Sequence, residues 1–143
     1  MSQLPNYDDS LTIALLRARE VVTALFREHV AEAGLTLTQW RVIRALADGE
    51  AMDTTTLADR CVILPPSLTR IINHLLAEGL VEKVPTKDKR QRAIQLTDNG
   101  RAVFNRVWAV SEHRYAEIKD RFGDSEVNAL VASLNRLREA LDS

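Results

Sequence analysis

Apolar residues recur at helical spacing in several separate segments of the chain. The first segment, from Asp9 to about Ala33, predicts one long helix. Two shorter helices are predicted next, one capped by Thr38 and one running from Thr54 to Val62 behind a cap on Asp53. A fourth extends from Pro65, since proline is favourable at a first helical position, to Glu78. The first half of the chain is therefore predicted to be helical.

The period of the pattern then changes. Leu80–Val84 and Ala93–Leu96 are typical of two short strands, and the polar stretch between them is typical of a turn. A long helix follows the cap Thr97-Asp98, and a last apolar helix follows the break at Gly123. This order predicts a mainly α fold with a small β-hairpin.

Composition narrows the class of protein. The 143 residues suit a single domain, and 45% of them are hydrophobic, which is enough for a core. The single cysteine, Cys61, excludes an intramolecular disulfide framework. No apolar run reaches the roughly 18 residues of a membrane-spanning helix, and the polar, acidic start is unlike a signal peptide. We therefore expect a cytoplasmic protein.

The third and fourth predicted helices, joined by a tight link, have the spacing of a helix-turn-helix. In that motif the second helix enters the major groove of DNA. Arginine recognises guanine and asparagine recognises adenine by paired hydrogen bonds, so a polar face on this helix can read bases. An ordinary amphipathic helix with a solvated face is the alternative. The candidate DNA-binding residues here are Pro66, Ser67, Thr69, Arg70, Asn73 and His74.

The predicted hairpin concentrates positive charge in a chain whose net charge is -1. From Lys83 to Arg92 the cations are Lys83, Lys87, Lys89, Arg90 and Arg92, set against one anion, Asp88, which we expect to pair with Arg90. A solvated turn is the commoner explanation for an isolated charge run. Directly behind a helix-turn-helix, however, a cationic hairpin is what a wing on DNA requires. We therefore expect Lys87, Lys89, Arg90 and Arg92 to contact DNA.

Several motifs resemble the MarR family of bacterial regulators: Leu57-Ala58, Ser67–Arg70, Gly79–Val81, and Asp88–Arg90 followed by Ile94–Thr97. The resemblance covers essentially the whole chain. It implies a single domain, residues 1–143, with a winged helix-turn-helix at about 36–97. It also implies a homodimer on double-stranded operator DNA, joined through dimerisation helices at about 9–33 and 98–143, because their apolar stripes would otherwise stay exposed.

Further stretches resemble family members that regulate catabolism of 4-hydroxyphenylacetate and homoprotocatechuate: Asp9–Leu16, Ala18–Glu20, Gln39–Arg41 and Ile63–Leu64 with Pro66–Thr69. One departure is Leu64, which stands where many members place a hydroxyl cap, a role that Ser67 would have to share. The resemblance implies a repressor of an aromatic-compound catabolic operon that a small aromatic acid releases.

An aromatic carboxylate requires a cation and an apolar wall. The candidate ligand-binding residues are Arg17, Arg19, Trp40 and Arg41. Salt bridges to Glu20 and Glu28, and a plain core position for Trp40, are the alternatives.

Cys61 suggests an alternative effector mechanism, a redox-responsive regulator. A reactive thiolate needs an accessible, electropositive setting, whereas the apolar residues after Cys61 favour burial. A protein-interaction module without DNA affinity is a second alternative, which the cationic hairpin disfavours. No nucleophile–base pair, metal-spaced cluster or phosphate loop is evident, so we expect no enzyme activity, metal or cofactor.

Overall fold

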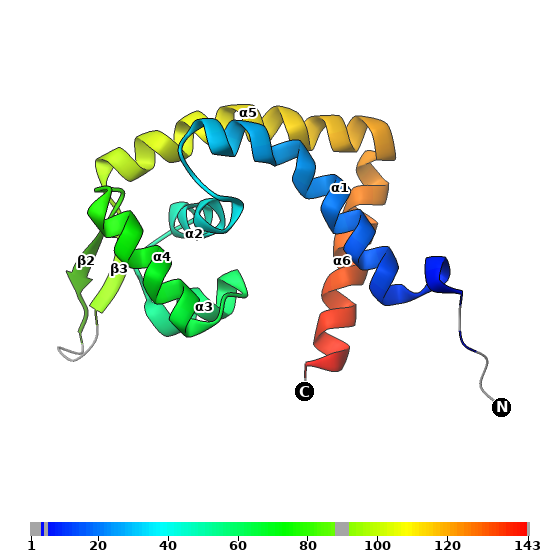
Figure 1. Ribbon diagram of the computed structural model, residues 1–143, viewed down its shortest axis with the longest axis horizontal. Coiled ribbons are helices and arrows are strands. Elements are labelled where there is room, and N and C mark those ends of the chain that lie inside the picture. Colours follow the sequence, from blue (N-terminus) through cyan, green and yellow to red (C-terminus); the bar gives the residue numbers. More distant parts are fainter. Residues whose placement is uncertain (1–3, 5, 88–91, 143) are drawn as a thin grey trace. The chain divides into compact units, whose positions relative to one another are not determined.

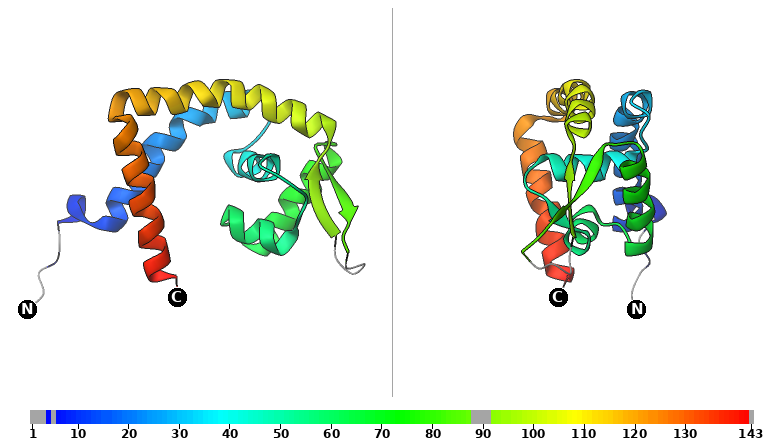
Figure 2. Two further views of the ribbon diagram at one scale, coloured as in Figure 1. Left: turned by 180° about the vertical axis from the view of Figure 1, so that it is seen from behind. Right: turned by 90° about the vertical axis from the view of Figure 1, so that its left-hand side faces the viewer.

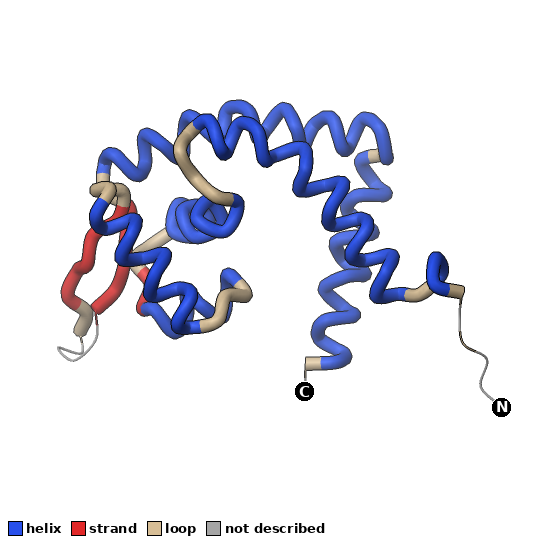
Figure 3. The backbone as a smooth tube through the Cα atoms, in the orientation of Figure 1, coloured by secondary structure: helices blue, strands red, loops and turns tan. Residues whose placement is uncertain are grey.

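The computed structural model describes residues 4, 6–87 and 92–142 and is mainly helical (Figure 1; Figure 3). The contacts divide the chain into two compact units, residues 1–108 and 109–143, with the boundary inside one long helix. The elements are a short 3-10 turn (Tyr7–Asp9), α1 (Leu11–Glu32), α2 (Leu37–Ala47), β1 (Met52–Asp53), α3 (Thr54–Cys61), α4 (Pro65–Ala77), β2 (Val81–Pro85), β3 (Arg92–Leu96), α5 (Asp98–Phe122) and α6 (Asp124–Leu141). The predicted order of helices and hairpin is confirmed.

Side-chain caps fix where the early helices begin. The start of α2 differs from the expectation: Thr36, not Thr38, is the cap, because Thr36 and Gln39 bond each other's backbone N–H in a capping box. Asp53 caps α3 as predicted, accepting from the Thr56 N–H at 2.8 Å and the Thr56 hydroxyl at 2.9 Å. These hydrogen bonds hold the pKa of the Asp53 carboxyl below its ordinary value.

The hairpin belongs to a three-stranded antiparallel sheet with the order β1-β3-β2. Lys83 lies opposite Ile94 in the hairpin, and on the other side of β3 Met52 lies opposite the same residue. The strand β1 is absent from the sequence-based expectation because two residues carry no periodicity. Its place in the sheet fixes the start of α3 beside the hairpin.

The base of the hairpin is bonded to the start of α5. The Thr97 hydroxyl donates to the Gly79 carbonyl at 2.6 Å and accepts from the Gly100 N–H at 3.0 Å. A Cβ on Gly100 would overlap the Leu80 carbonyl oxygen, so only glycine permits this approach. The hairpin therefore has a firm base in the unit formed by residues 1–108.

Each unit has a buried or half-buried face and an apolar face that remains exposed. In residues 1–108 large, fully buried aliphatic side chains come from α1 to α5 and β3: Val30, Val42, Ile43, Leu46, Leu57, Leu68, Leu75, Ile94 and Val107. Exposed apolar side chains gather in the first half of α1 and along α6: Leu11, Leu15, Leu16, Val21, Val22, Leu130, Val131 and Leu134. None of the described helices is long and apolar enough to cross a membrane.

Candidate DNA-binding surface and effector site

The helix α4 separates an apolar face from a polar one. Leu68, Ile72 and Leu75 are buried beneath it. The predicted recognition residues lie on the other face: Ser67 is half-buried, and Pro66, Thr69, Arg70, Asn73 and His74 are exposed. The Thr69 hydroxyl donates to the Pro65 carbonyl at 3.0 Å, so it already has a partner in its own helix. Arg70 and Asn73 are thus exposed on this face with side chains that can make paired hydrogen bonds to base edges.

The turn between α3 and α4 ends the first helix sharply. Val62 has φ 56 and ψ 50, the left-handed conformation, and its N–H donates to the last carbonyls of α3. Turns of this motif often contain glycine, and a β-branched residue with positive φ is unusual. Two residues later Leu64 is the N-cap of α4, which no side chain caps, so the structure gives Ser67 no capping role. Both aliphatic side chains point into solvent, with 86% and 76% of their surface exposed.

The hairpin strand β2 lies next to α4 (Figure 2). A cleft of about 310 Å³ is lined by Thr69 and Asn73 from α4, Lys83 from β2 and Arg92 from β3. Lys87 is exposed further along the hairpin. The tip residues Lys89 and Arg90, and the expected Asp88–Arg90 pair, lie outside the described residues. Polar recognition groups and cations therefore share one surface.

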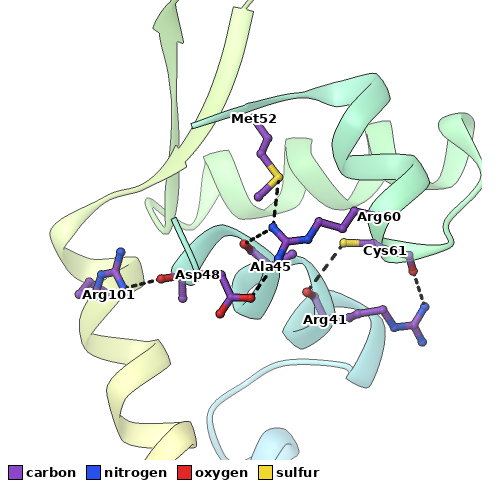
Figure 4. Close-up of polar contacts among 8 residues, drawn as sticks. Arg41, Ala45, Asp48, Met52, Arg60, Cys61 and Arg101 are labelled. Carbon is purple, nitrogen blue, oxygen red and sulfur yellow. Dashed lines mark hydrogen bonds and ion pairs between the residues drawn. The ribbon is translucent and has the colours of Figure 1, made fainter. Parts of the chain in front are cut away.

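Two arginines fasten α3 to α2 (Figure 4). The Arg41 guanidinium donates to the Cys61 carbonyl at 3.0 Å, and the Cys61 thiol lies 3.9 Å from the Arg41 carbonyl. At the other end of α2, Arg60 reaches the Asp48 carboxylate at 3.0 Å and the Ala45 carbonyl at 3.5 Å. These contacts, made from the two sides of α3, hold the helix-turn-helix against α2.

Cys61 is buried, with 2% of its surface exposed, as the sequence indicated. Burial raises the pKa of its thiol, and the nearby positive charges of Arg41 and Arg60 offset this only in part. A buried thiol that resists ionisation is a poor target for peroxide. The structure therefore disfavours the redox alternative.

Three aromatic rings stack between α2 and the first turns of α5. The centroids of Trp40 and Phe104 are 5.6 Å apart, those of Phe104 and Trp108 are 6.1 Å apart, and both pairs are nearly parallel. The guanidinium carbon of Arg44 lies 5.1 Å from the centre of the Trp108 ring, within cation–π distance. A half-buried arginine beside an aromatic stack matches what an aromatic carboxylate needs.

The arginines predicted to bind ligand lie in other settings. Arg17 is exposed, pairs with Asp8 at 2.7 Å, and lies over the Tyr7 ring. Arg19 is exposed on α1, and the Arg41 guanidinium bonds Cys61 as described. The ligand-binding candidates chosen from the sequence omit Arg44, although its spacing of four residues from Trp40 places both on one face of α2. Within the described residues, no group of three His, Cys, Asp or Glu side chains is arranged to hold a metal.

A helix-turn-helix followed by a hairpin with cations beside it defines a winged DNA-binding protein. The model of the MarR family matches residues 33–92. The homoprotocatechuate degradative operon repressor of Escherichia coli is 42% identical over 124 residues, which cover 86% of this chain and 84% of the relative. The chain therefore belongs to the MarR family and is a transcriptional regulator, not an enzyme.

Solved structures agree over nearly the whole chain. NadR in complex with 4-hydroxyphenylacetate is similar with a TM-score of 0.84 and 33% identity, covering 96% of this chain and 97% of that one. The transcriptional repressor CouR bound to a 23-mer DNA duplex is similar with a TM-score of 0.82 and 27% identity, covering 95% and 99%. The predicted fold class, a winged helix-turn-helix with long terminal helices, is thereby confirmed.

Proposed function

We propose that this chain is a homodimeric repressor of an aromatic-compound catabolic operon and that a small aromatic acid releases it from its operator. The observation that carries DNA binding is the shared surface of α4 and the hairpin, where Asn73, Lys83 and Arg92 line one cleft. Arg70 is exposed on the same helix α4. The polar face of α4 reads the major groove, with Pro66, Ser67, Thr69, Arg70, Asn73 and His74. The cations of the hairpin, with Lys89 and Arg90 at its tip, contact phosphates or the minor groove.

The effector site belongs to the aromatic stack. Trp40, a candidate from the sequence, supplies an apolar wall, and Arg44 supplies the cation that pairs with the carboxylate. Arg44 is favoured because its guanidinium carbon lies 5.1 Å from the centre of the Trp108 ring, at the edge of the aromatic stack. Two similar proteins, the homoprotocatechuate degradative operon repressor and NadR in complex with 4-hydroxyphenylacetate, indicate which acids to test.

Release requires the acid to prefer a state of the dimer that fits the operator poorly. A ligand that binds both states equally shifts neither. A tenfold loss of operator affinity needs a coupling free energy of only about 1.4 kcal/mol, which one charge-assisted pair on Arg44 is able to supply. The hydrogen bonds of Arg41 and Arg60 connect α2, where the acid binds, to the helix-turn-helix.

The wing assignment is tested by salt dependence. Replacing Arg92 with glutamine should lower the slope of log affinity against log salt by about one for each wing that contacts DNA, because each lost phosphate contact releases one counterion fewer. The slope is measured by fluorescence anisotropy on a selected duplex between low and physiological salt. Arg106→Gln, an exposed arginine on α5, is the matched control and should leave the slope unchanged. An unchanged slope in Arg92→Gln would remove Arg92 from the interface.

The effector assignment is tested by release. Arg44→Ala should bind operator like the wild type but need at least about tenfold more 4-hydroxyphenylacetate for half-release, because a charge-assisted pair to the carboxylate is lost. Arg17→Ala and Arg19→Ala should release at the wild-type concentration. If one of those two variants, and not Arg44→Ala, loses its response, the cation lies on α1. The same titration with homoprotocatechuate compares the two acids.

A further inference from the structure

The recognition helix α4 begins with apolar residues. Leu64 occupies the N-cap, where Ser, Thr, Asp or Asn would accept a backbone hydrogen bond and stabilise the helix. Pro65 and Pro66 follow and have no N–H groups. Helix N-termini that bind phosphate do so through such N–H groups. The N-terminus of α4 therefore has few backbone N–H groups with which to bind an anion.

Leu64 also contributes little to the packing of the folded chain. With 76% of its surface exposed, it is not part of the core. It borders a groove of about 470 Å³ between α3 and α4, which Val62, Pro65 and Thr69 also line. Asp59 is the single charged residue among those lining the groove. A carboxylate there disfavours phosphate and leaves a neutral, apolar occupant as the better match.

The groove continues into the proposed DNA surface. Thr54, Thr55 and Thr69 line both this groove and the cationic cleft beside the hairpin. In a helix-turn-helix the first residues of the recognition helix contact base edges. The major-groove edge of DNA offers one exposed hydrocarbon group, the 5-methyl of thymine. Leu64 thus lies where the start of the recognition helix would contact a thymine methyl group.

We propose that Leu64 is a specificity-determining residue that packs against a thymine 5-methyl group in each operator half-site. The proposal rests on the proposed DNA-binding function and adds a base preference at one position. Arg70 and Asn73 read their bases by hydrogen bonds, whereas Leu64 reads its base by burial of apolar surface. An exposed leucine in place of a polar cap is then explained by the complex and not by the folded chain alone.

The test uses the full-length protein and a duplex that it selects from a random-sequence pool. Thymines of the selected duplex are replaced one at a time by deoxyuridine, which lacks only the methyl group. Wild type should lose about fourfold in affinity at one thymine position per half-site, the loss expected for one buried methyl. Leu64→Ala should bind the unmodified duplex more weakly and lose nothing further at that position.

Leu64→Ser separates stability from recognition. Serine at the N-cap should raise the denaturation midpoint, while affinity for the thymine-containing duplex falls and the deoxyuridine effect disappears. A leucine with a purely structural role would not give this combination. Leu4→Ala, which alters a leucine that is 95% exposed far from the turn along the chain, is the matched control and should retain the full deoxyuridine effect.

The outcomes are distinguishable. If every deoxyuridine duplex binds as well as its thymine counterpart, or if Leu64→Ala keeps the same sensitivity as wild type, Leu64 does not read thymine and the DNA-binding function still stands. If no duplex is enriched and the wild type binds all sequences alike, the proposed function itself fails, and the role of Leu64 fails with it.

Discussion

Glutamate at positions 130 and 134 of α6 should dissociate the proposed dimer and abolish operator binding. Leu130 and Leu134 lie in the apolar stripe of this helix, and 47% and 39% of their surfaces are exposed in the single chain. Burying an unpaired carboxylate in an apolar interface costs several kcal/mol. We expect the double variant to raise the dimer dissociation constant by at least about three orders of magnitude, which is about 4 kcal/mol.

Sedimentation velocity over a micromolar concentration range measures the dissociation, and circular dichroism checks that the helices persist. The matched control is Ala129→Glu, which adds a charge on the face of α6 away from the stripe and should leave the dimer intact. A double variant that stays dimeric and binds operator would show that subunits associate through another surface. Loss of binding in a monomer with intact helices would show that both subunits are needed on DNA.

Alanine at position 70 should reduce affinity for the selected duplex by about 1–3 kcal/mol and leave binding to random DNA nearly unchanged. The reason is that a bidentate contact from Arg70 to guanine is made only at the right base, while phosphate contacts are made everywhere. Arg70→Lys keeps the charge but loses the planar fork. It should therefore resemble Arg70→Ala on the selected duplex.

Competition with random DNA measures both affinities in one titration. Arg106→Ala, which removes an exposed arginine from α5, is the control and should change neither of them. If Arg70→Ala loses equally on selected and random DNA, Arg70 contacts a phosphate and the base must be read elsewhere on α4.

Most of the fold could be predicted because amphipathic periodicity decides which side of each helix is buried. Spacing alone predicts a buried stripe of Leu68, Ile71, Ile72 and Leu75 on α4. The structure buries three of them and leaves Ile71 half-buried. The error at the start of α2 was avoidable, since Thr36 and Gln39 have the spacing of a capping box. The strand β1 was not predictable, because its two residues are extended only through pairing with β3.

The candidate site was less accessible to sequence reasoning because side-chain partners are set by tertiary structure. Nothing near Arg41 in the sequence reveals that its guanidinium bonds the Cys61 carbonyl, twenty residues later. The stack of Trp40 on Phe104 likewise joins distant segments. The spacing of Arg44 from Trp40 was the available signal, and it acquires meaning only beside Trp108.

The arginine contacts that hold α3 to α2 also bear on the spacing of operator half-sites. Because Arg60 bonds the end of α2 and Arg41 bonds the end of α3, we expect the helix-turn-helix to move together with α2. In the proposed dimer the two recognition helices must then be about 34 Å apart, one turn of DNA. Little movement of each helix within its subunit is available to change this distance. One base pair inserted at the centre of the operator rotates one half-site out of phase. The effector and the inserted base pair would thus act on the same quantity, the register between protein and double helix.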